Sequence, residues 1–164
     1  MPRTDIKQEK LDEEVEHILE ESRMVLPGIQ ALFGFQLIAV FNSRFDEVLG
    51  HGAQVLHLVA VMLTALAIAL IMAPAAYHRQ AERGSISRYL ADYASRLLAI
   101  GMAPLLTALA IEVSLVAFMI LRSVAASSAI GTALLLIFGW LWYGFPAQKK
   151  RRRAPSRAAS SPQP

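Results

Sequence analysis

The sequence predicts an all-α fold, an integral membrane four-helix bundle that is preceded by an amphipathic helix on the cytoplasmic side. Three observations predict it: long uncharged stretches, basic residues that gather outside alternate ends of these stretches, and a strongly apolar composition. The 164 residues are 55% hydrophobic and only 18% charged. Because a bilayer core about 30 Å thick needs about 20 apolar residues of helix to cross it, stretches of this kind are typical of membrane spans.

The uncharged stretches define four expected spans. Asp, Glu, Lys and Arg are absent from residues 24–43, 48–77 and 123–148, and Glu112 is the one such residue in 97–121. We therefore expect a transmembrane domain over residues 24–145, with spans at about 24–42, 53–76, 97–121 and 124–145.

Residues 1–23 are predicted to form an acidic amphipathic cytoplasmic helix, because Leu11, Val15, Ile18 and Leu19 follow helical spacing. With eight acidic residues against four basic ones, this helix should be repelled by anionic lipid. We expect it to pack on the arginine-rich segment between the second and third spans; the alternative is a solvated helix. Pro27 leaves two outcomes, a break before the first span or one long kinked helix.

The distribution of basic residues predicts the orientation, because lysine and arginine in short loops stay cytoplasmic. Residues 1–23, the segment 77–96 and the tail carry all of them except Arg44 and Arg122. Both termini should thus be cytoplasmic in a multi-pass protein. The tail, residues 146–164, is basic and rich in proline and serine, which is typical of a disordered cytoplasmic segment that attracts anionic lipids.

Glu112 is the candidate for chemistry inside the membrane, since a carboxylate near the bilayer centre is costly to insert. Its depth is comparable to that of Gln36, and the two residues form the candidate intramembrane proton site. A protonated Glu112 bonded to Gln36, Thr107 or Ser114 would be structural, whereas proton coupling would need access to water. His57 is expected to be an interfacial histidine with water access.

A second candidate site is a polar cluster at the cytoplasmic face, where the first span begins and the second ends. Its members are Gln30, Tyr77, His78 and Arg79. We expect this cluster to dock the acidic N-terminal helix or to bind an anionic headgroup. The alternative is ordinary interfacial anchoring of two helix ends.

Motifs for enzymatic chemistry are missing from the sequence. It has no cysteine, no phosphate-binding glycine loop, no His/Glu spacing for a metal and no G-x-S-x-G motif. We therefore expect no enzyme and no cofactor or metal. Nucleic-acid binding is not expected either, because membrane topology already explains the basic residues.

Two motifs carry a resemblance to a known family. Leu26–Phe35 reads LPGxQxLFxF and Ala73–Arg79 reads APxxYHR. Together they resemble a family of small uncharacterised bacterial inner-membrane proteins with four predicted spans, some of which are labelled sodium:proton antiporter. The resemblance implies a bacterial inner (plasma) membrane protein.

Two functions follow from these expectations. The first is a structural or accessory subunit that acts by helix–helix or lipid contacts, as a homo-oligomer or with another membrane protein. The alternative is a small proton-coupled, antiporter-like transporter that uses Glu112 as an oligomer.

Overall fold

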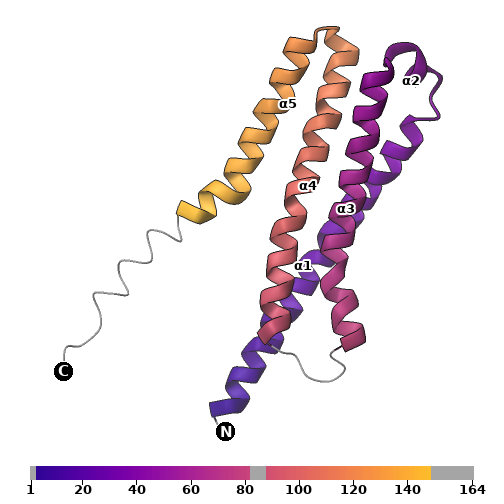
Figure 1. Cartoon of the computed structure of the whole chain (residues 1–164). Helices are drawn as coiled ribbons and strands as arrows, with labels where there is room; N and C mark the ends of the chain where they lie inside the picture. Colours follow the sequence, from indigo (N-terminus) through magenta and orange to yellow (C-terminus); the bar gives the residue numbers. More distant parts are fainter. Residues whose placement is uncertain (1–2, 82–87, 149–164) are drawn as a thin grey trace.

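The computed structural model describes residues 3–81 and 88–148, and its regular elements over these ranges are helices (Figure 1). They confirm the all-α fold. The elements are α1 (Arg3–Ala39), α2 (Ser43–Val48), α3 (His51–Ala81), α4 (Arg88–Leu121), α5 (Val124–Gly139) and the π-helical turn η1 (Trp140–Gly144).

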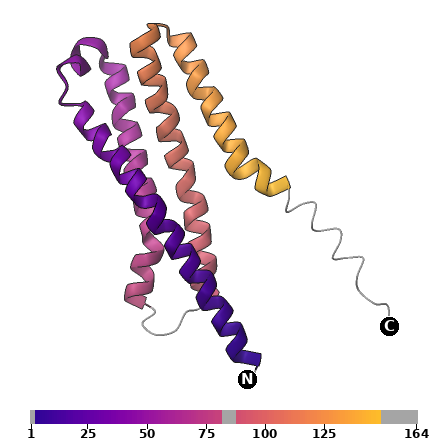
Figure 2. The same cartoon turned by 180° about the vertical axis from the view of Figure 1, so that it is seen from behind.

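The four long helices alternate in direction and form the bundle. Helix α2 and the turn between α4 and α5 lie at one end, which we call the loop end (Figure 1). The start of α1, the end of α3 and the start of α4 lie at the opposite end, which we call the terminal end. Helix α4 contacts α1, α3 and α5, while α1 crosses the face formed by α3 and α4 (Figure 2).

Three helical segments are long and apolar enough to cross a membrane: His51–Gln80, Arg88–Leu121 and Val124–Gln148. Many of their large apolar side chains point outward, for example Leu58, Met62, Ile120, Leu136 and Ile137. An exposed apolar surface of this extent suits lipid rather than water. The expected first span is not among the three, since its helix ends at Ala39 instead of residue 42 and contains two glutamines.

Helix α1 settles the two outcomes left open at Pro27, because it runs without a break from Arg3 to Ala39. The boundary expected near residue 23 therefore lies inside a continuous helix. The acidic half of α1 packs on protein: Val15 is fully buried against Leu90 and Ala91 of α4. These contacts are apolar, so burial of side chains holds this half of α1 against the bundle.

The other helices also extend beyond the expected spans. Helix α4 begins at Arg88, about nine residues before the expected start of the third span at residue 97. After η1 the chain stays helical through Gln148, so residues 146–148 are helical where we expected the tail to begin. The rest of the tail lies outside the described residues.

Helix α5 starts at a capped turn and packs closely on α4. Ser123 accepts a hydrogen bond from the Ala126 backbone N–H at 3.4 Å, which satisfies one free donor of the first turn. Further along, Gly131 is buried against α4, where an added Cβ would overlap the Ser114 hydroxyl and lie 2.8 Å from the Ala110 carbonyl oxygen. A glycine at this position allows the two backbones to approach each other.

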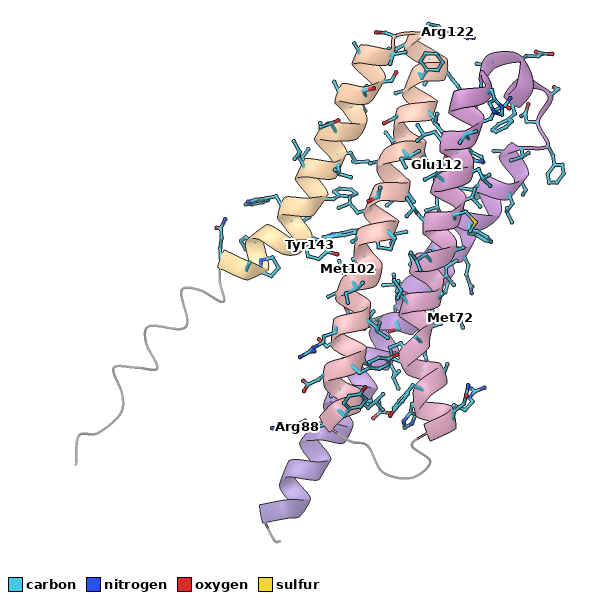
Figure 3. The ribbon with its side chains drawn as sticks, in the orientation of Figure 1. Met72, Arg88, Met102, Glu112, Arg122 and Tyr143 are labelled. Carbon is cyan, nitrogen blue, oxygen red and sulfur yellow. The ribbon has the colours of Figure 1, made fainter. Side chains whose placement is uncertain are left out.

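The end of α5 is joined to α4 by one hydrogen bond. Tyr143, in η1, donates its hydroxyl to the Ala99 carbonyl oxygen at 2.6 Å (Figure 3). We expect Tyr143→Phe to lower the free energy of unfolding by about 0.5–1.5 kcal/mol, because the phenyl ring keeps the packing but loses the bond. Denaturant unfolding in detergent measures this, with the exposed Tyr89→Phe as the control. Equal stability of the two variants would contradict the prediction.

Candidate functional site

Three polar side chains from three helices meet inside the bundle. They are Gln36 of α1, His57 of α3 and Glu112 of α4, which we call the intramembrane polar cluster. Gln36 and His57 are only 3% and 4% exposed. Glu112 projects from α4 toward α3 in Figure 3.

Hydrogen bonds connect all three members of the cluster. The Gln36 side-chain amide donates to Glu112 Oε1 over 3.0 Å. His57 Nδ1 lies 3.0 Å from the same oxygen and 3.3 Å from Glu112 Oε2. His57 Nε2 lies 3.0 Å from the backbone carbonyl oxygen of Gln36. The cluster therefore ties α1, α3 and α4 together at one depth.

The hydrophobic core places these side chains. Ile29, Ala67, Ile71 and Leu105 form a buried cluster between the same three helices. Gln36 follows Ile29 by two helical turns, as Glu112 follows Leu105, so each continues the buried face of its own helix. The polar cluster thus sits on the loop-end side of the core.

A pocket of about 200 Å³ borders the cluster on its loop-end side. Its walls are formed by Ala39, Asn42, Phe45, Leu49, His57, Glu112, Leu115, Val116 and Met119. The Phe45 ring of α2 meets the His57 ring edge to face, with centroids 5.2 Å apart. The Glu112 side chain is 18% exposed and that of His57 is 5% exposed, so Glu112 is the more accessible member of the pair.

Of the partners considered for Glu112, the structure brings Gln36 to it. Thr107 and Ser114 instead bond to backbone carbonyl oxygens of their own helix, at Ala103 and Ala110, over 2.9 Å and 2.7 Å. The contact between Gln36 and Glu112 is present in the structure, and their role in proton chemistry stays a prediction.

The expectation that His57 is accessible to water is wrong, because the residue is buried and bonded to Glu112; its position at the membrane interface stays a prediction. A signal for this was present in the sequence. Ala60, Thr64, Ala67 and Ile71 follow His57 at intervals of three or four residues, and all are buried. This spacing places His57 on the face of α3 that packs against its neighbours.

The residues of the predicted cytoplasmic cluster lie at different levels of the bundle. Tyr77 packs with Leu19 and the Val15 cluster, and its ring is 5.5 Å from that of Tyr93. Gln30 is exposed on α1, roughly three turns beyond Leu19 or about 16 Å along the axis, so it does not meet Tyr77. The cause is the length of α1, whose acidic half occupies the level where we expected the first span to begin.

His78 and Arg79 follow Tyr77 in the last turns of α3. His78 is half-buried, and its Nδ1 atom is buried without a hydrogen-bond partner among the described residues. Arg79 is exposed and makes an interaction of its own. Binding of an anionic headgroup by these two residues stays a prediction.

The fold and this site define the class: a helical membrane protein with a polar cluster buried between three of its helices. The chain belongs to the family of unknown function DUF6328, whose model matches residues 4–146. Comparison with curated proteins and with solved structures gave no match. The sequence motifs predicted membership of an uncharacterised family, and this match confirms that prediction.

Proposed function

We propose that the protein is a non-enzymatic structural or accessory subunit of the bacterial inner membrane, with both termini in the cytoplasm. It acts through contacts of its helices with lipid and with other membrane helices, as a homo-oligomer or beside another protein. The supporting observation is the outer surface of the helical segment Val124–Gln148: only 11% of its most apolar 18-residue stretch is buried within the chain.

The distribution of polar groups agrees with this proposal. Gln36, His57 and Glu112 point toward one another inside the bundle. Apolar side chains such as Leu136 and Ile137 face outward. A surface of this composition binds lipid tails or other apolar helices, for which close packing supplies the attraction. Anionic lipids are the expected partners of the basic tail.

A second candidate function is proton-coupled, antiporter-like transport, and one observation favours it. The Glu112–His57 pair borders a pocket, and ionisable residues at membrane depth are functional candidates by default. An oligomer would supply the additional helices that a permeation pathway needs.

Flux measurements on purified protein in liposomes distinguish the two functions. We expect no proton or sodium flux above that of protein-free liposomes, since a subunit that acts by contacts needs no pathway. Flux that disappears in Glu112→Gln and persists in Glu47→Gln would instead support transport. Glu47 is the matched control because it is an exposed glutamate, on the short helix α2.

A further inference from the structure

We propose that His57 and Glu112 together bind a single exchangeable proton, and that this proton is exchanged only with the loop end of the bundle. The inference goes beyond the proposed function, because a proton site of this kind can serve a structural subunit or a transporter. It rests on the hydrogen-bond geometry of the pair, on the pocket beside Glu112 and on the apolar core behind it.

The position of one hydrogen follows from the imidazole. His57 Nε2 faces the backbone carbonyl oxygen of Gln36 at 3.0 Å, and a carbonyl oxygen only accepts hydrogen bonds. The Nε2 atom therefore carries a hydrogen and donates it. This bond fixes the tautomer of the neutral ring and leaves Nδ1 as the atom that faces Glu112.

The second hydrogen must lie between Nδ1 and the carboxyl group. His57 Nδ1 forms a hydrogen bond with Glu112 Oε2 at 3.3 Å and lies 3.0 Å from Oε1, so a hydrogen on one of the two groups is donated to the other. Either Nδ1–H donates to a carboxylate, or the Glu112 hydroxyl donates to a neutral imidazole. Both arrangements contain the same number of protons and have no net charge.

Loss of this proton would disrupt the pair. The lone pair of Nδ1 would then face the carboxylate, and a negative charge would stay buried with the Gln36 amide as its donor. An uncompensated charge in an apolar environment is costly. On this ground we assign the geometry of the pair to the form that holds the shared proton.

The pocket provides the route for exchange. Glu112 borders it, and the other walls include Asn42 after α1, Phe45 of α2 and Met119 near the end of α4. All three belong to the loop end. In the exchange step the Glu112 O–H bond breaks, its proton passes to water in the pocket to give hydronium, and the electron pair stays on the carboxylate.

The opposite direction is closed by the core. Ile29, Ala67, Ile71 and Leu105 fill the space between α1, α3 and α4 on the terminal-end side of the cluster. Aliphatic side chains neither donate nor accept protons. Among the described residues, the pair forms hydrogen bonds with Gln36 of α1 and a ring contact with Phe45 of α2, and neither of these side chains is titratable.

The first experiment tests the shared proton, using purified protein in nanodiscs. We expect the nitrogen resonances of His57 and the infrared carboxyl band of Glu112 to change together in one titration as the pH is raised. The coupled transition should be lost in both Glu112→Gln and His57→Gln, and it should persist in His51→Gln. Independent titrations, or a His57 titration that is unchanged in Glu112→Gln, would overturn the proposal.

The second experiment tests the side of exchange and uses the absence of cysteine from the natural chain. Single-cysteine variants in sealed vesicles are treated with a membrane-impermeant thiol reagent. Ser43→Cys and Gln80→Cys mark the loop end and the terminal end, since both residues are exposed. We expect Met119→Cys to react from the same side as Ser43→Cys, and Leu105→Cys to be protected from both sides.

Labelling of Leu105→Cys from the terminal end would overturn the one-sided route. Neither experiment measures flux, so a failure of this inference can be separated from a failure of the proposed function. A shared proton in the absence of flux would leave both intact.

Discussion

Replacing His57 with leucine should lower the free energy of unfolding by about 2–5 kcal/mol, the usual cost of removing one partner of a buried hydrogen-bonded charge pair. The substitution leaves Glu112 without its imidazole partner and removes the bond to the Gln36 backbone. Unfolding by denaturing detergent in mixed micelles, followed by circular dichroism, measures the loss.

His51→Leu is the matched control, because His51 is an exposed histidine at the start of the same helix. We expect it to change stability by less than about 0.5 kcal/mol. Combining His57→Leu with Glu112→Leu should recover part of the loss, since both buried polar partners are then replaced by apolar groups. Equal stability of His57→Leu and His51→Leu would contradict the role of His57 in holding the bundle together.

Gly131→Ala should destabilise the contact between α4 and α5 by about 1–3 kcal/mol, the range for overpacking a close contact. The added Cβ would lie 2.8 Å from the Ala110 carbonyl oxygen, which is backbone and cannot rotate away. The helices must move apart, and α5 depends mainly on α4 for its contacts. Unfolding in detergent and proteolysis of the α4–α5 turn both report this change.

Gly139→Ala provides the comparison within the same helix. Its added Cβ would meet the Leu106 side chain at 3.9 Å, an ordinary contact. Because alanine is a better helix former than glycine, this variant should be neutral or more stable by up to about 1 kcal/mol. If both alanine variants were equally stable, the close approach at Gly131 would not limit the packing of α5.

The helical architecture could be predicted from the sequence because a bilayer imposes a minimum length on every apolar helix. The uncharged stretch of residues 48–77 reads directly as α3, and that of 123–148 as α5 with its π-helical turn. The depth of Glu112 relative to Gln36 also followed from helical rise alone. The length of a helix and the depth of a residue along it do not depend on how the helices are rotated about their axes.

The remaining features depend on how each helix is rotated about its own axis and how far it is shifted along its neighbours, and a single sequence defines neither. His57 lies 55 residues before Glu112 in the chain, and their contact depends on which faces of α3 and α4 meet. The offset between Gln30 and Tyr77 depends on the length of α1, which continues as one helix on both sides of the level where we expected the first span to begin. Pro27 was compatible with a break and with one long helix, and packing of Val15 on Leu90 and Ala91 supports the continuous helix.

The unbroken course of α1 has a mechanical consequence. Its 37 residues form a rod about 55 Å long, which exceeds the thickness of the hydrocarbon layer. The part of the helix before Pro27 carries the acidic residues at the terminal end, and the part after it carries Gln36 at the level of Glu112. A tilt of the acidic part of α1 therefore moves Gln36 as well, to the extent that the helix does not bend at Pro27.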